Sequence, residues 1–173
     1  MLCVILIQML KRETVFLSLG SNLNDRLLFL ENAKKNLCKL KIEIEKESSI
    51  YETEPLEFHE QPFFLNQVLK IKTSLEPLKL LFFIKNIEQK MGRIQRQKNG
   101  PREIDIDILF YNVMIINLPE LIIPHPAICK RRFVLVPMVE IEPDFVHPVA
   151  GKTVKELLLE LNDNYKVKLY KRF

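Results

Sequence analysis

Apolar and polar residues recur along the chain with two periods, and these periods predict its secondary structure. Apolar residues at helical spacing predict one helix over 27–40 and another over 77–91, which Gly92 is placed to end. Ser74 is expected to cap the second helix, with Pro77 in its first turn. Strand-like stretches stand at 14–19, 42–51, 64–73 and 103–111.

The order of these elements predicts the fold class. Strand, helix, strand, strand, helix, strand is the ferredoxin-like arrangement, so we expect an α+β protein with a βαββαβ core and a largely antiparallel sheet. Beyond the core we expect a short strand at 113–116, helices at 131–139 and 153–161, and a C-terminal strand at 165–170. The 173 residues fit one domain over 14–173, preceded by an extension of residues 1–13.

Composition and charge narrow the class of partner. The chain is 47% hydrophobic and 28% charged, which favours a compact globule. Its net charge of +4 is too small to indicate a nucleic-acid partner, but the cations are clustered. One cluster holds Arg93, Arg96, Lys98 and Arg102, and the other is the run from Lys130 to Arg132. Two basic clusters predict a polyanionic ligand.

Cysteine usage and the first residues bear on the compartment. The three cysteines are widely separated and have neither metal-ligand spacing nor the density of a disulfide scaffold, so we expect a reducing cytoplasm. The apolar run 1–10 is too short to span a bilayer, and no membrane association is expected. We expect the chain to work as a monomer.

Asp105 and Asp107 form the clearest candidate site. In the run from Arg102 to Ile108 a period of two sends Ile104, Ile106 and Ile108 to one face of a strand and both aspartates to the other. Neighbouring carboxylates repel unless a cation lies between them, and hard oxygen ligands suit Mg²⁺ that carries substrate phosphates. The alternative is the ordinary polar face of a half-exposed strand.

Three further positions are candidates for binding. Phe64 and Asn66 share a strand face and would present an aromatic plane beside an amide to a flat heteroaromatic ligand, although residue chemistry alone favours a core phenylalanine beside a turn-stabilising asparagine. His125 lies between two prolines and could donate to phosphate or be structural. No GxxxxGK[ST] phosphate loop is present, which excludes the commonest solution for ATP binding.

With these residues assembled, the chain resembles the 6-hydroxymethyl-7,8-dihydropterin pyrophosphokinases from about Thr14 to Leu161. The motifs occur in order: Ser18-Leu-Gly-Ser-Asn22, Tyr51-Glu-Thr53 with Pro55-Leu56, Gln61-Pro62 before Phe64-Leu-Asn66, Gly92-Arg93, Gly100-Pro-Arg-Glu-Ile-Asp-Ile-Asp-Ile108, Pro124-His125-Pro126, and Arg131-Arg-Phe-Val-Leu-Val-Pro137 with Glu140-Ile141. The stretch through the two aspartates is the most specific.

The resemblance implies an activity and a role for each matched residue. A diphosphate would pass from ATP to the pterin hydroxymethyl group in tetrahydrofolate biosynthesis, and two Mg²⁺ ions would bridge the ATP phosphates from Asp105 and Asp107. The implied catalytic residues are Arg93, Arg102, Asp105 and Asp107. ATP contacts would come from Glu88, Arg93, Arg102, Ile108, His125 and Arg131. Pterin contacts would come from Thr53, Glu54, Leu56, Phe64, Asn66, Asp105 and Phe133.

The chain departs from the family pattern in the basic loop. The loop from Arg93 to Arg102 is one residue short, which leaves open whether Gln95 or Arg96 takes the role of the second loop arginine. Asn99 stands where relatives often carry an aromatic, and Pro126 where some carry tyrosine. Two other functions fit the same residues: a Mg²⁺-dependent phosphohydrolase and a non-catalytic nucleotide-binding domain.

Overall fold

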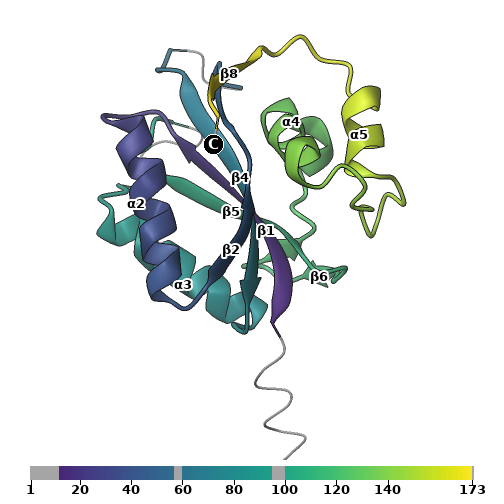
Figure 1. The fold of residues 1–173 in the computed structure, drawn as a ribbon, viewed down its shortest axis with the longest axis horizontal. Helices are drawn as coiled ribbons and strands as arrows, with labels where there is room; N and C mark the ends of the chain where they lie inside the picture. Colours follow the sequence, from purple (N-terminus) through teal and green to yellow (C-terminus); the bar gives the residue numbers. More distant parts are fainter. Residues whose placement is uncertain (1–11, 57–59, 95–99, 173) are drawn as a thin grey trace, which may run out of the picture.

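The computed structural model describes residues 12–56, 60–94 and 100–172, which form a six-stranded sheet with helices on both faces (Figure 1). The core elements follow one another as β1 (Glu13–Ser21), α2 (Arg26–Lys39), β2 (Glu43–Glu47), β3 (Ile50–Thr53), β4 (Phe64–Thr73), α3 (Pro77–Lys90) and β5 (Asp105–Tyr111). Strands β2 and β3 both pair with β4 and together take the place of one predicted strand. The predicted βαββαβ core is therefore confirmed.

The strand order places the functional end of the sheet. The strands run β5-β1-β4-β3-β8, with β8 at Val167–Lys171, and β2 pairs with β4 off this path. All of the pairings between these strands are antiparallel, as expected. Because neighbouring strands run in opposite directions, β1 and β3 finish at the same end of the sheet at which β4 and β5 begin. The candidate residues of these four strands therefore meet at one end of the sheet.

The elements after β5 include the two helices of the second helical layer, α4 and α5. They are β6 (Ile116–Asn117), β7 (Ile122–Ile123), the 3₁₀ turn η1 (Ile128–Lys130), α4 (Arg132–Ile141), α5 (Val154–Glu160) and β8. The strand predicted at 113–116 is mostly wrong, since only Ile116 is in a strand. The chain reverses directly after β5, where Asn112 has a φ of 47° and the Met114 amide donates to the Tyr111 carbonyl at 3.0 Å.

The two ends of α3 test the predicted helix signals. Gly92 follows the helix with a φ of 88°, so its role as a terminator is confirmed. The expected cap at Ser74 is wrong, because the N-cap is Glu76 and its side chain makes no capping bond. Pro77 at the first helical position has no N–H to satisfy and a φ already set for a helix, so the end forms without a side-chain cap.

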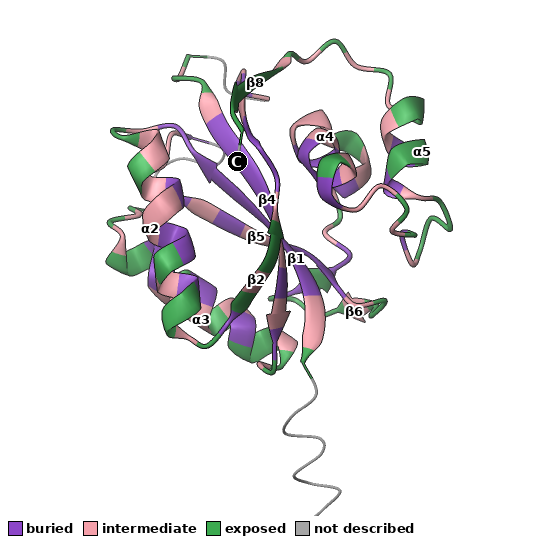
Figure 2. Ribbon diagram, in the orientation of Figure 1, coloured by how far each residue is buried: buried purple, intermediate pink, exposed green. Residues whose placement is uncertain are grey.

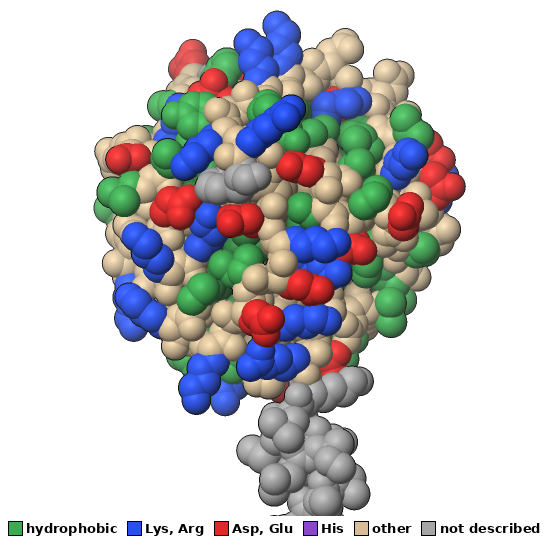
Figure 3. Space-filling model, viewed as in Figure 1, with side chains coloured by type: hydrophobic (Ala, Val, Ile, Leu, Met, Phe, Trp, Pro, Cys, Tyr) green, Lys and Arg blue, Asp and Glu red, His purple; other side chains and the backbone are tan. Residues whose placement is uncertain are grey.

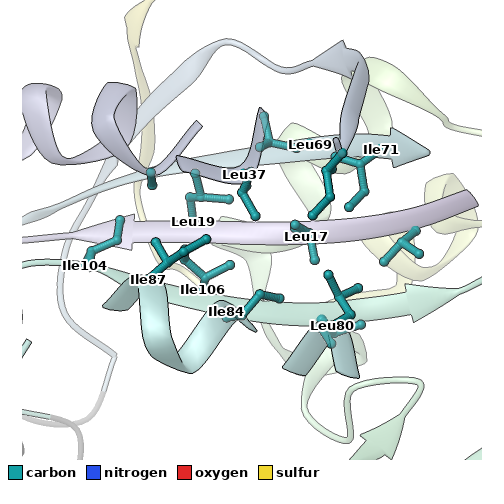
Figure 4. Close-up of a cluster of buried hydrophobic side chains, with 14 of the residues drawn as sticks. Leu17, Leu19, Leu37, Leu69, Ile71, Leu80, Ile84, Ile87, Ile104 and Ile106 are labelled. Carbon is teal, nitrogen blue, oxygen red and sulfur yellow. The ribbon is translucent and has the colours of Figure 1, made fainter. Parts of the chain in front are cut away.

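Each face of the sheet has its own apolar core. Figure 4 shows the larger one, where Leu17, Leu19 and Ile106 of the sheet pack against Leu37 of α2 and Ile84 and Ile87 of α3. The second lies on the opposite face, where Phe16, Val68 and Phe110 pack against α4 and α5. Buried residues accordingly run through the middle strands in Figure 2, while the outer helix faces are exposed. The sheet is held from both sides and gives the site a rigid base.

One face of the molecule carries charges of both signs. On the face drawn in Figure 3, cationic and anionic side chains are interspersed with apolar ones. In the described part of the chain no helix combines the length and the apolar character needed to cross a bilayer.

Candidate active site

The predicted pterin residues line a cavity at the end of the sheet where β1 and β3 finish and β4 and β5 begin. Its lining includes every one of them: Thr53, Glu54, Leu56, Phe64, Asn66, Asp105 and Phe133. The other lining residues are Ser18, Gly20, Gln61, Arg102, Asp107 and Arg131. The structure thus brings together side chains that lie up to 115 positions apart in the sequence, from Ser18 to Phe133.

The two aspartates stand on the face of β5 that the alternation predicted. Ile104, Ile106 and Ile108 are at most 4% exposed and belong to the core under α3, so the side chains of Asp105 and Asp107 point the other way. Asp105 lies opposite Gly20 of β1, and Asp107 lies opposite Ser18. These neighbours have small side chains, which leaves the space above the carboxylates open.

Arginines surround the aspartates. Arg93 contacts Asp105 Oδ1 at 2.8 Å through one terminal nitrogen and Glu88 Oε2 at 2.5 Å through the other. Burial lowers the pKa of Arg93, but the charges of Asp105 and Glu88 outweigh it and raise the pKa above its ordinary value. Arg102 Nε lies 3.1 Å from Asp105 Oδ2, and Arg131 lies 3.3 Å from Asp107 Oδ2. Arginine side chains therefore lie beside both carboxylates.

Glu88 holds this arrangement from beneath. Its side chain is 2% exposed, and its Oε1 accepts a hydrogen bond from the Ile106 amide at 2.7 Å. Its other oxygen contacts Arg93 and lies 2.9 Å from Lys85 Nζ. These contacts make Glu88 a support for Arg93 and for the strand that carries the aspartates. The nucleotide contact that the family resemblance implies for Glu88 stays a prediction.

A bulge in β5 brings His125 to Asp107. Along β1 the partners of Phe16 and Leu17 are Phe110 and Ile108, so Leu109 is the extra residue of the bulge. The freed Leu109 carbonyl accepts a hydrogen bond from the His125 amide at 2.9 Å. The imidazole Nε2 then lies 3.8 Å from Asp107 Oδ2, and burial lowers the pKa of His125 against the opposing charge of Asp107.

A second hollow lies on the other side of Asp107. Its lining includes two of the predicted ATP residues, Ile108 and His125, together with Asp107 itself. The remaining lining residues are Leu81, Lys85, Ile106, Pro119, Glu120, Leu121, Ile122 and Pro126. No sequence pattern indicated that the hairpin of β6 and β7 would form a wall of this hollow, because its residues become neighbours of β5 only in the fold.

The cavity has two aromatic rings in its lining, each accompanied by an arginine. The guanidinium carbon of Arg102 lies 5.3 Å from the centroid of the Phe64 ring, and that of Arg131 lies 5.7 Å from the Phe133 ring. Asn66, which lines the same cavity, is 4% exposed, and its Nδ2 donates to Thr53 Oγ1 at 2.7 Å. This bond fixes the direction in which the amide oxygen points.

Asn22 lies beside the cavity, and no role for it was predicted from the sequence. Its Oδ1 accepts from the Arg102 amide at 2.8 Å, and its own amide donates to the Arg102 carbonyl at 3.1 Å. Its Nδ2 donates to Gln61 Oε1 and to the Pro62 carbonyl. The motif Ser18-Leu-Gly-Ser-Asn22 marked the position, but only the fold shows that it joins the end of β1 to two loops.

One predicted basic cluster splits between two places, and part of the other lies outside the described residues. In the run Lys130-Arg131-Arg132, Arg131 faces the cavity, while Arg132 pairs with Asp163 away from it. Gln95, Arg96, Lys98 and Asn99 lie outside the described residues, as do residues 57–59, so the choice between Gln95 and Arg96 stays open.

The family model of 7,8-dihydro-6-hydroxymethylpterin-pyrophosphokinase matches residues 16–143. The chain is 48% identical over 143 residues to the 2-amino-4-hydroxy-6-hydroxymethyldihydropteridine pyrophosphokinase of Aquifex aeolicus, an alignment that covers 83% of this chain and 89% of that protein. It is 43% identical over 152 residues to the folic acid synthesis protein fol1 of Pneumocystis carinii. That alignment covers 88% of this chain but only 20% of the fungal protein, so the chain spans about a fifth of that longer relative.

Solved structures agree on the fold. Wild-type HPPK-DHPS of Plasmodium falciparum superposes with a TM-score of 0.70 at 20% identity, over 87% of this chain and 43% of that chain. The ferredoxin-like core and its helical layers are therefore those of known structures. Together with the match of the family model and the identity to the Aquifex enzyme, the site and fold show that the chain belongs to the 7,8-dihydro-6-hydroxymethylpterin-pyrophosphokinase family.

Proposed function

We propose that this protein transfers a diphosphate from ATP to 6-hydroxymethyl-7,8-dihydropterin, in the synthesis of tetrahydrofolate. The pterin hydroxymethyl oxygen forms a bond to the β-phosphorus of ATP and loses its proton to water. The bond between that phosphorus and the oxygen that bridges to the α-phosphorus breaks. AMP leaves with the bridging oxygen, and the pterin carries the diphosphate.

The observation that carries this proposal is the position of Asp107 between two cavities. It lines the aromatic cavity that holds Phe64 and Phe133, and it lines the hollow that holds Ile108 and His125. A pterin in the first and a nucleotide in the second would meet at the aspartates. Attack on phosphorus needs this meeting, because aligned reactants supply much of the rate in phosphoryl transfer.

The donor set fits Mg²⁺ that arrives with ATP. Among the described residues no group of three or more acidic, histidine or cysteine side chains gathers to cage a metal ion. Mg²⁺ at nucleotide sites uses one or two carboxylates and takes its other ligands from phosphates and water, which matches Asp105 and Asp107. When bound, the two proposed ions would be held by Asp105 and Asp107 and would offset the negative charge of the phosphates.

The arginines and the histidine would orient the phosphates. Arg102 Nε is buried and donates no hydrogen bond to the residues that the structure describes, although Asp105 lies close to it. A buried N–H without an acceptor is unfavourable, so an incoming phosphate oxygen would satisfy it. Arg93, Arg131 and His125 are already gathered at the aspartates and would move little to reach the same phosphates.

The pterin side would select a flat, polar ring system. Phe64 and Phe133 supply aromatic surface, and Asn66 supplies an amide oriented by Thr53. The backbone from Thr53 to Leu56 would pair with the polar edge of the ring. These contacts hold the hydroxymethyl group toward Asp105 and Asp107 and exclude water from its place.

Several finer features of the proposal rest on the sequence. We propose that residues 14–173 act as one domain and as a monomer, with no nucleic acid or membrane partner. The separated cysteines and the use of ATP support a cytoplasmic reaction.

The products of ATP turnover test the proposal. The purified protein is incubated with ATP, Mg²⁺ and the reduced pterin, and nucleotides and phosphate are quantified with and without the pterin. We expect AMP and pterin diphosphate in equal amounts, and only when both substrates are present. Phosphate or ADP released without pterin would indicate a phosphohydrolase, and binding of ATP without any product would indicate a nucleotide-binding domain.

A further inference from the structure

We infer that the segment from Leu161 to Lys166, named the strap, sets the spacing between the two walls of the pterin cavity, with Tyr165 as its main positioning residue. The strap lies between α5 and β8 and outside the residues 16–143 that the family model matches. This inference rests on the proposed function, since it assigns the strap to the pterin cavity of that function.

One end of the strap holds the wall that carries Phe133. Arg132, the residue before it, donates from Nε to a carboxylate oxygen of Asp163 and from a terminal nitrogen to the Leu161 carbonyl at 2.8 Å. The charged pair is largely shielded, with side-chain exposures of 26% for Arg132 and 16% for Asp163. Because Arg132 makes two hydrogen bonds and is largely shielded from solvent, it fixes the start of α4. It therefore also fixes the backbone from which the Phe133 side chain projects.

The other end of the strap holds the wall formed by Glu54 and Leu56. The Tyr165 hydroxyl donates to the Leu56 carbonyl at 2.9 Å, and the Lys166 amide donates to Glu54 Oε1 at 3.0 Å. Strand β3 ends at Thr53, which pairs with Val167 of β8. The strap therefore adds hydrogen bonds to this wall beyond the point where the pairing of β3 with β8 ends.

The two attachments are joined within a few residues. The oxygen of Asp163 that accepts from Arg132 also accepts from the Tyr165 amide at 3.3 Å. A path of hydrogen bonds thus runs from Arg132 through Asp163 and Tyr165 to Leu56. It connects the cavity wall that carries Phe133 to the wall formed by Glu54 and Leu56. When the two walls are held at a fixed spacing before the ring system binds, less conformational entropy is lost on binding.

Loss of the Tyr165 hydroxyl tests the strap with the least disturbance. Tyr165→Phe keeps the ring and removes only the bond to Leu56. Pterin affinity is measured by calorimetry on the full chain, with Mg²⁺ and a non-hydrolysable ATP analogue present, and steady-state rates are measured in parallel. We expect the dissociation constant and the KM for pterin to rise about three- to tenfold, as loss of one ordinary hydrogen bond predicts, with kcat and the affinity for the ATP analogue within about twofold.

Tyr170→Phe is the matched control. Tyr170 lies on β8, is 49% exposed, and its hydroxyl makes no hydrogen bond with the residues that the structure describes, so this variant should keep the pterin affinity of the wild type. Asp163→Asn provides a second variant of the strap and should weaken pterin binding in the same direction. Amide exchange at Leu56 should quicken in both strap variants and not in the control.

The outcomes separate the strap from the proposed function. Equal pterin affinity in Tyr165→Phe and Tyr170→Phe would overturn the strap as a positioning device, and so would a fall in kcat with unchanged pterin affinity. Neither result would affect the proposed function, which rests on turnover by the wild-type protein. Wild-type protein that makes no AMP from ATP and pterin would instead overturn the proposed function. A lower melting temperature in Tyr165→Phe with unchanged pterin affinity would reduce the strap to a support of the fold.

Discussion

The Asn22 side chain accepts a hydrogen bond from the Arg102 amide at 2.8 Å, across 80 positions of sequence. Its Nδ2 group reaches the neighbouring loop at Gln61 and Pro62, so one carboxamide joins the end of β1 to both loops beside the cavity. Asn22 itself is 1% exposed. The position of the Arg102 guanidinium beside Asp105 therefore depends on a residue that touches neither proposed substrate.

We predict that Asn22→Ala lowers kcat/KM about 10- to 100-fold, because displacement of a catalytic group by about 1 Å is enough for such a loss. Asn112→Ala is the control: Asn112 Oδ1 accepts from the Thr14 amide at the opposite end of β1, far from the cavity. Steady-state kinetics and thermal unfolding of both variants distinguish a positioning role from a stability role. If both variants lost the same activity for the same loss of stability, Asn22 would be a structural residue only.

Asp107→Asn should lower turnover by more than about 100-fold, since loss of one group that stabilises developing charge has an effect of this size. The side chain is 30% exposed and its partner Arg131 is 26% exposed, so the free energy of unfolding should change by no more than about 1 kcal/mol. Asp105→Asn should behave alike in turnover. Mg²⁺-dependent binding of an ATP analogue, followed by calorimetry, should weaken in both.

Asp144→Asn, at an exposed carboxylate outside the cavity, is the control for these variants. A third or more of wild-type activity remaining in Asp105→Asn or Asp107→Asn at ordinary Mg²⁺ concentrations would show that the metal-ligand assignment is wrong.

Gly20→Ala should weaken pterin binding through Asn66. A Cβ on Gly20 would lie 3.1 Å from Asn66 Oδ1, and the bond to Thr53 limits how far that amide can turn away. We expect a several-fold rise in the dissociation constant for pterin and about 1–3 kcal/mol of destabilisation, the usual effect of overpacking.

A double-mutant cycle with Asn66→Ala tests that cause. If the clash with Asn66 is responsible, Gly20→Ala should add little to the effect of Asn66→Ala on pterin affinity. Full additivity of the two changes would place the cause elsewhere.

His147 should make the fold less stable at mildly acidic pH. It is 5% exposed, its Nδ1 accepts from the amides of Val149 and Ala150, and burial lowers its pKa below the ordinary value of 6.5. Above pH 6.5 both folded and unfolded chains hold it neutral, and its contribution is complete. As the pH falls below 6.5 the unfolded chain binds the proton first, so stability declines until the lowered folded pKa is reached.

Urea unfolding of the wild type and His147→Asn at pH 7.5 and 5.5 measures this decline. Asparagine can keep an acceptor near the Nδ1 position but does not titrate, so the variant should lose less stability between the two values. An equal loss in both proteins would assign the acid sensitivity to other groups.

The sequence by itself determined the elements and the chemistry of the site. The alternation of isoleucine and aspartate in β5 fixed which residues face the core, because a period of two permits only one assignment once one face is apolar. The order of helices and strands predicted the ferredoxin-like core, and the ordered motifs indicated the family. Helix boundaries were predicted wherever apolar spacing and glycine agreed, and the cap at Ser74 failed because Pro77 made a side-chain cap unnecessary.

Only the tertiary structure decided how these pieces support one another. The bulge at Leu109 that brings His125 to Asp107, the buried Glu88 that holds Arg93, and the bonds of Asn22 to Arg102 join residues far apart in sequence. The strap contact between Tyr165 and Leu56 is of the same kind, with 109 positions between its partners. Periodicity reports only which face a side chain takes within its own element, whereas these contacts depend on how separate elements pack, and packing is a property of the whole chain.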